Sequence, residues 1–140
     1  MGVLHLPSSV RDAVVAYARA DHPDECCGVM AGTWAGSDVT VSRAVAMTNA
    51  EPSPTWFSFD SAEQLKVWRE IDDADEEVVV IYHSHTMTEP APSRTDLQFA
   101  EGTGEALWLL VSTRSDDDEV KAWRIVGGAA VEEEIVLVGG

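Results

Sequence analysis

The chain has 140 residues, of which 45% are hydrophobic, and a formal net charge of −16 at pH 7. This length fits a single domain over residues 1–140, and the hydrophobic content suits an ordinary globular core. The negative charge disfavours nucleic acid as a partner, because phosphates would be repelled. We expect a cytoplasmic protein without membrane contact, since no segment has the roughly 20 apolar residues that cross a bilayer and the first residues lack a signal peptide.

In the first half of the chain, a helix is followed by strands. The predicted elements are a helix from Ser8 to the His22-Pro23 stop, a strand over 27–31 and a strand over 39–47. Either Ser8 or Ser9 is expected to cap the helix. Gly32 is expected to end the first strand.

The middle of the chain predicts a loop, a helix and a central strand. Asn49 and the prolines and serine after it are turn formers, which predicts a loop over 48–54. A short extended piece over 55–59 then leads to a helix that Asp60 or Ser61 caps and that ends near Ile71. We expect Leu65 and Trp68 of this helix to face inward. The apolar run over 78–82 predicts a buried strand.

Strands dominate the last third of the chain. Two prolines predict a loop over 86–92, and a helix is expected from Ser93 to about Ala100. Three further strands are predicted over 106–112, 120–126 and 130–138. Because helices and strands alternate early and strands gather late, the pattern favours a mixed α/β layer fold.

Two histidines, His83 and His85, follow the predicted central strand with one residue between them. Residues i and i+2 of a strand point to the same side, so both rings should enter one small volume. Asp96 lies a short loop further on and can add a carboxylate. Two imidazoles and one carboxylate suit a zinc-like cation and leave a fourth position for water, which is typical of catalytic zinc.

Asp96 also has a competing interpretation. Ser93 and Asp96 have the spacing of a capping box, with Ser93 as the N-cap of the helix that follows. Both interpretations can hold together, because a helix that begins at this point fixes Asp96 on its first turn, facing the histidines. The adjacent Cys26 and Cys27 do not suggest a disulfide, and Cys27 suits a small core residue better than a nucleophile.

These residues resemble the signature of a known family. His83-Ser84-His85, followed by Ser93 and then Asp96, is similar to the motif of the JAMM (MPN+) metalloproteases. The stretch Pro23-Asp24-Glu25-Cys26-Cys27-Gly28 resembles the upstream glutamate motif of the same family. The wider similarity is to small bacterial hydrolases that release cysteine from a ubiquitin-like sulfur-carrier protein, and it covers residues 21–28, 48–68 and 80–96.

The resemblance implies a fold and a set of roles. The implied fold is α/β, with a JAB1/MPN-like mixed β-sheet flanked by helices in a cytidine-deaminase-like layering. One Zn²⁺ per chain would be held by His83, His85 and Asp96. Glu25 would take a proton from the metal-bound water, and Ser93 would stabilise the oxyanion. For Glu25, the alternative is an exposed loop carboxylate, which is what most glutamates are.

The resemblance also implies a substrate. The partner would be a sulfur-carrier protein ending in Gly-Gly, and hydrolysis after that Gly-Gly would release cysteine. A groove for the carrier's tail would be lined by Trp56, Phe57, Ser58 and Thr86, with core packing as the alternative for the aromatic residues. Two other functions stay open: a broader isopeptidase that removes ubiquitin-like modifiers from lysines, and a non-catalytic MPN scaffold.

Overall fold

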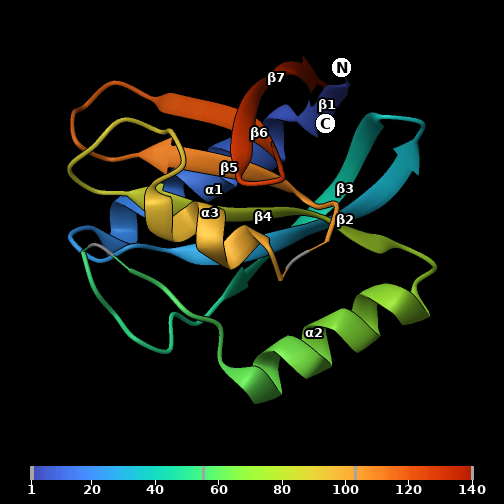
Figure 1. Ribbon diagram of the computed structural model, residues 1–140, viewed down its shortest axis with the longest axis horizontal. Helices are drawn as coiled ribbons and strands as arrows, with labels where there is room; N and C mark the ends of the chain where they lie inside the picture. Colours follow the sequence, from blue (N-terminus) through green and yellow to red (C-terminus); the bar gives the residue numbers. More distant parts are fainter. Residues whose placement is uncertain (1, 55, 103, 140) are drawn as a thin grey trace.

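The computed structural model describes residues 2–54, 56–102 and 104–139. Its elements are, in chain order, β1 (Val3–Pro7), α1 (Ser8–Asp21), β2 (Cys27–Ala35), β3 (Asp38–Met47), α2 (Ser61–Asp73), β4 (Glu77–His85), α3 (Arg94–Ala100), β5 (Leu107–Ser112), β6 (Glu119–Val126) and β7 (Ala129–Val138). The predicted α/β class is therefore confirmed (Figure 1). Thr55, the first residue of the predicted extended piece, lies outside the described residues.

The strands form one closed sheet in the order β1-β3-β2-β4-β5-β6-β7. β1 closes it, because this strand pairs in parallel with both β3 and β7. The sequence analysis missed β1, which is only five residues long and places just Leu4 and Leu6 on its buried side. β4 lies near the middle of the strand order, antiparallel to β2 and parallel to β5.

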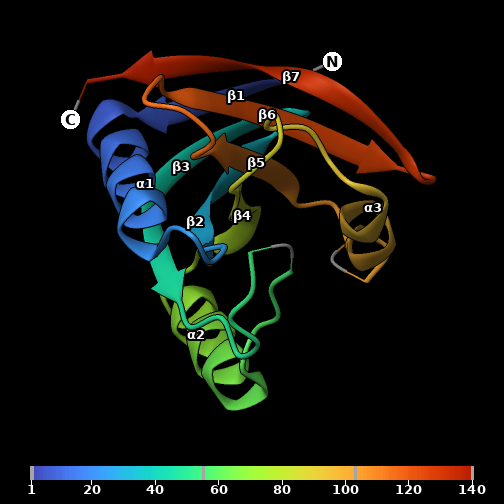
Figure 2. The same ribbon diagram turned by 90° about the vertical axis from the view of Figure 1, so that its left-hand side faces the viewer.

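Helices pack on both faces of this sheet. α1 contributes Val14, Val15 and Ala18 to the apolar core on one face. α2 contributes Val67 and Ile71 to the core on the other face. Figure 2 shows α1 and α3 on opposite sides of β4 and β5. Among the described residues, no helix is long and apolar enough to cross a membrane.

Three local predictions were wrong. Leu65 is 55% exposed, because the buried face of α2 carries Val67 and Ile71 instead. The N-cap of α1 is Pro7, and the Ser8 hydroxyl donates to the Val138 carbonyl rather than capping the helix. Gly32 does not end β2, since the strand accommodates it through an irregularity in register and continues to Ala35.

The register between β2 and β4 depends on one close contact. Gly28 lies opposite Tyr82, and Cys27 lies opposite His83. A Cβ atom on Gly28 would come 2.3 Å from Cζ and the hydroxyl oxygen of Tyr82. Tyr82 is 1% exposed and packed in the core, so its ring has little room to move away. Glycine is therefore required at position 28, where β2 pairs with β4.

We predict that Gly28→Ala lowers the free energy of unfolding by about 1–3 kcal/mol, the usual cost of overpacking a core. Gly102→Ala is the matched control, because its Cβ would meet only Phe99 O, at 3.8 Å. Urea denaturation of the parent and both variants measures the difference. Equal midpoints for the parent and Gly28→Ala would contradict the requirement for glycine.

Candidate metal centre

His83 and His85 are among the last residues of β4, and both side chains are buried. Their ring centroids are 5.0 Å apart. The structure thus places both rings on one side of the strand end, as expected for residues i and i+2. Phe57 stacks on the His83 ring with a centroid separation of 4.6 Å, and the edge of Trp108 approaches the same ring at 5.7 Å. These aromatic contacts fix the orientation of His83.

Asp96 reaches both histidines from the first turn of α3. Its Oδ1 lies 2.9 Å from His83 Nε2, and its Oδ2 lies 3.1 Å from His85 Nε2. The predicted capping box is also present, because Ser93 Oγ accepts from Asp96 N–H and Asp96 Oδ2 accepts from Ser93 N–H. The capping box therefore holds the Asp96 carboxylate between the two rings.

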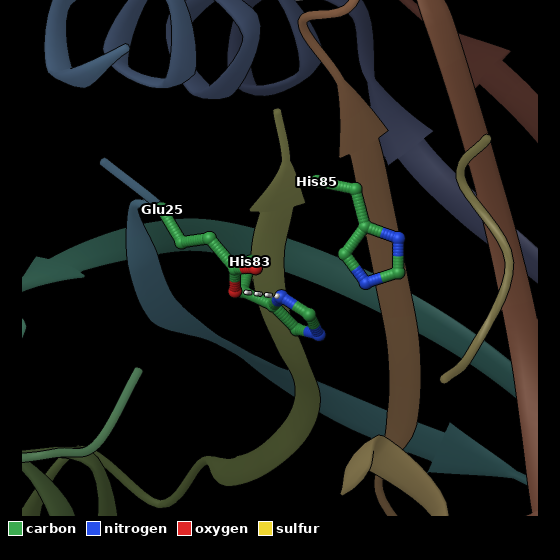
Figure 3. A group of neighbouring side chains, drawn as sticks. All are labelled: Glu25, His83 and His85. Atoms are coloured by element: carbon green, nitrogen blue, oxygen red, sulfur yellow. Dashed lines mark hydrogen bonds and ion pairs between the residues drawn. The ribbon is translucent and has the colours of Figure 1, made fainter. Parts of the chain in front are cut away.

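Glu25 approaches His83 from the segment just before β2. Its Oε1 lies 3.1 Å from His83 Nδ1 (Figure 3). Ligand atoms of Glu25, His83 and His85 all lie within 4.8 Å of one another, and all three residues are buried. These residues are positioned to bind a metal ion. The structure therefore brings Glu25 and Asp96 to the same pair of histidines.

Oxygen atoms lie close to both nitrogens of each ring. His85 Nδ1 donates to the Glu89 carbonyl at 3.0 Å, and its Nε2 lies 3.1 Å from Asp96 Oδ2. His83 Nδ1 lies 3.1 Å from Glu25 Oε1, and its Nε2 lies 2.9 Å from Asp96 Oδ1, a contact without good hydrogen-bond geometry. Each Nε2 therefore faces a carboxylate, and either a proton or a metal ion can lie between them. With both Nε2 atoms deprotonated, two lone pairs and a carboxylate converge, and this donor set fits a divalent cation.

The charges of the cluster also favour a cation between the two histidines. Burial alone would lower the pKa of His83, but the carboxylates of Asp96 and Glu25 outweigh burial and raise that pKa to about 9. Burial would likewise raise the pKa of Asp96, but its contacts with His83 and His85 hold that pKa well below the usual range of a carboxyl. The carboxylates therefore demand positive charge between the rings, which either a proton or a metal ion supplies.

The residues predicted to line a substrate groove are divided between core and surface. Phe57 is 1% exposed and packs beneath His83, so its side chain belongs to the core, which was the alternative interpretation. Thr86 is also buried, and its hydroxyl donates to the Pro54 carbonyl. Trp56 and Ser58 are partly exposed. A groove therefore stays a prediction, with only Trp56 and Ser58 presenting side-chain surface.

Neither cysteine suits the role of nucleophile. Cys26 and Cys27 are fully buried free thiols. Burial raises the pKa of each thiol to about 12, so neither forms a thiolate at neutral pH. Cys27 packs in the core as predicted.

Two residues near the site had no predicted functional role. Asn49 was interpreted only as a turn former, yet its side chain donates to the carbonyl of Glu25. Ser84, the residue between the histidines, accepts a hydrogen bond from the main chain of Cys26. The position of Ser84 within the His-x-His motif was the only signal in the sequence, and Asn49 offered none.

Residues 7–126 match the family described as prokaryotic homologs of the JAB domain. The chain is 53% identical over 137 residues to a CysO-cysteine peptidase of Mycobacterium tuberculosis, covering 97% of this chain and 92% of that protein. It is 34% identical over 105 residues to a desampylase of Haloferax volcanii, covering 72% of this chain and 75% of that protein.

Two solved structures share the fold of this chain. The solution structure of a Desulfitobacterium hafniense protein matches all of this chain and 94% of that chain, with a TM-score of 0.87 and 28% identity. A Salinibacter ruber protein matches 99% of this chain and 92% of that chain with a TM-score of 0.70, and at 24% identity it supports the fold alone. From the match over residues 7–126 and the 53% identity, we conclude that this chain belongs to the prokaryotic JAB-domain family.

Proposed function

We propose that this chain is a zinc-dependent peptidase that hydrolyses the bond after the C-terminal Gly-Gly of a ubiquitin-like sulfur-carrier protein and releases cysteine. The observation that carries the proposal is the 53% identity, over 97% of the chain, to a CysO-cysteine peptidase. The buried cluster of Glu25, His83, His85 and Asp96 supports it, because these residues offer both metal ligands and a base.

In the proposed site, His83, His85 and Asp96 hold the metal. The geometry favours this set, because both Nε2 atoms face the Asp96 oxygens, whereas Glu25 contacts His83 at the opposite ring nitrogen. A zinc ion held there would act as a Lewis acid that increases the acidity of a water molecule and polarises the scissile carbonyl.

The remaining steps belong to side chains of the chain itself. Glu25 accepts a proton at its carboxylate from the attacking water, whose oxygen bonds to the carbonyl carbon of the terminal glycine. As the carbon–nitrogen bond breaks, Glu25 returns that proton to the leaving amine. Ser93 donates its hydroxyl proton in a hydrogen bond to the oxyanion. This role is compatible with the capping box, in which Ser93 Oγ acts as an acceptor and its O–H stays available as a donor.

A second candidate function is the removal of a ubiquitin-like modifier from lysine. The 34% identity to a desampylase favours it. The connection from β4 to α3, residues 86–93, is short and favours a small leaving group over a second protein. A non-catalytic scaffold is disfavoured, because Glu25, His83 and His85 converge as a buried group that could hold a metal ion.

The metal assignment predicts about one zinc per chain in purified protein. His83→Ala removes a buried ligand and should lose nearly all of it, as measured by elemental analysis. His5→Ala is the matched control, because His5 lies on β1, outside the site, and this variant should keep the metal. Full zinc content in His83→Ala would contradict the site.

The role of Glu25 predicts a separation of metal binding from turnover. Glu25→Gln keeps an oxygen that can accept from His83 Nδ1 but cannot take a proton. This variant should retain zinc, and its rate of hydrolysis should fall about 10²–10⁴-fold, the usual contribution of a general base. If Glu25→Gln loses zinc instead, the carboxylate of Glu25 is a ligand and the base lies elsewhere.

The substrate assignment predicts a preference between two leaving groups. A carrier ending in Gly-Gly-Cys should be cut to the Gly-Gly form and free cysteine. The same carrier joined through Gly-Gly to a lysine side chain of a second protein should be cut far more slowly, because the short connection beside the metal provides little surface to hold that protein. Mass spectrometry of both reactions, at matched enzyme and zinc, measures the ratio. Faster cleavage of the isopeptide would favour the second candidate function.

A further inference from the structure

The main chain that carries Glu25 is held at each of its polar atoms over two residues. Glu25 N–H donates to Ser53 O at 2.8 Å, and Glu25 C=O accepts from Asn49 Nδ2 at 3.1 Å. Cys26 N–H donates to Ser84 Oγ at 2.8 Å, and Cys26 C=O accepts from Ser84 N–H at 3.2 Å. Two side chains, those of Asn49 and Ser84, therefore grip the two polar atoms of one peptide bond, the bond that joins Glu25 to Cys26.

The Asn49 amide uses its full hydrogen-bonding capacity. Its two N–H groups donate to the carbonyls of Glu25 and Trp56, both at 3.1 Å. Its oxygen accepts from Glu51 N–H at 3.0 Å and from Ser58 N–H at 3.1 Å. An amide with two donors and two acceptors is the only side chain of this size that satisfies all four contacts. Asn49 thus ties the carbonyl of Glu25 to the segment that precedes α2.

Ser84 ties the other end of the same peptide bond to the strand that carries the histidines. It is fully buried, and its side chain points away from the side occupied by His83 and His85, because neighbouring residues of a strand alternate. One three-residue stretch therefore directs two rings to the metal centre and a hydroxyl to the Glu25 segment. The hydroxyl holds the Cys26 N–H, in the peptide bond directly after Glu25.

We propose that Asn49 and Ser84 are positioning residues that fix the Glu25 carboxylate at the metal centre by clamping the Glu25–Cys26 peptide bond. This inference rests on the proposed function, because it takes Glu25 as the general base. A base acts only within hydrogen-bond reach of the proton it takes. A displacement of about 1 Å can cost about 10²-fold in rate, so the position of the main chain behind Glu25 matters for turnover.

The first test uses Ser84→Ala, which removes the hydroxyl and leaves every proposed metal ligand in place. The kcat for the Gly-Gly-Cys carrier should fall by about 10- to 100-fold, while KM changes by less than about twofold and zinc content is unchanged. Ser84→Thr keeps the hydroxyl and should recover most of the lost kcat. Ser42→Ala is the control, because its hydroxyl likewise forms a hydrogen bond with the main chain, by donating to the carbonyl of Ala31 on β2 away from the metal centre, and its kcat should match the parent.

Asn49→Asp tests the other half of the clamp. This isosteric change keeps the oxygen that accepts from Glu51 and Ser58 but removes both N–H donors, including the one to Glu25. It should lower kcat and retain zinc. Because Asn49 lies partly exposed in a loop, this variant carries the test if Ser84→Ala does not fold.

A double-mutant cycle separates positioning from general structural support. In a Glu25→Gln background there is no base to position, so adding Ser84→Ala or Asn49→Asp should cause no further loss of the residual rate. A merely structural role would lower the residual rate again. Parent-like kcat in both single variants, or a further loss in the double variants, would overturn the proposal.

One readout does not depend on the substrate. Ser84 should protect the Cys26 amide proton from exchange with deuterium, and Ser84→Ala should accelerate that exchange while leaving distant strand amides unchanged. If the parent does not cut the carrier yet shows this protection, the proposed substrate fails and the clamp stands. If the parent cuts the carrier and Ser84→Ala leaves both kcat and exchange unchanged, the clamp fails and the function stands.

Discussion

The antiparallel pairing of β2 with β4 is the constraint on which the metal centre depends. It sets Cys27 opposite His83, so that Glu25, two residues before Cys27, reaches the end of β4. A slip of one residue would turn His83 and His85 to the other face of the sheet, because side chains alternate along a strand. The contact between Gly28 and Tyr82 opposes such a slip, since no other residue fits at that point of β2. The register of β2 against β4 therefore determines the geometry of the site.

The site concentrates negative charge in a place that water barely reaches. Glu25 and Asp96 are 5% and 4% exposed, and the rings between them are equally buried. Burying two carboxylates is costly unless positive charge lies between them, which is why the pKa of His83 is raised. A divalent cation satisfies the same demand better than a proton, because it accepts both Nε2 lone pairs and a carboxylate at once. The fold thus buries a negative charge that a metal ion would balance.

The convergence of His83, His85 and Asp96 could be predicted from short spacings in the sequence, whereas Glu25 was predicted only through the resemblance to a family motif. The interval between His83 and His85 gives their common side, and the capping-box spacing of Ser93 and Asp96 gives the helix start that carries the carboxylate. Closure of the sheet by β1 could not be predicted, since five residues with only Leu4 and Leu6 buried give a weak period. The roles of Asn49 and Ser84 were equally hidden, because both contact main-chain atoms of residues more than twenty positions away.

The closed sheet limits how an extended peptide can reach the metal centre. β4 is paired with β2 on one side and with β5 on the other, so it offers no free edge for strand addition. The tail of the proposed carrier would therefore not add as a strand beside β4. In the segment after β4, three successive carbonyls already accept side-chain hydrogen bonds, namely those of Thr88 from Ser112, Glu89 from His85 and Pro90 from Trp123. These hydrogen bonds fix the segment after β4, and a fixed segment beside the proposed metal would favour a slender tail such as Gly-Gly, whose residues carry no Cβ to collide with it.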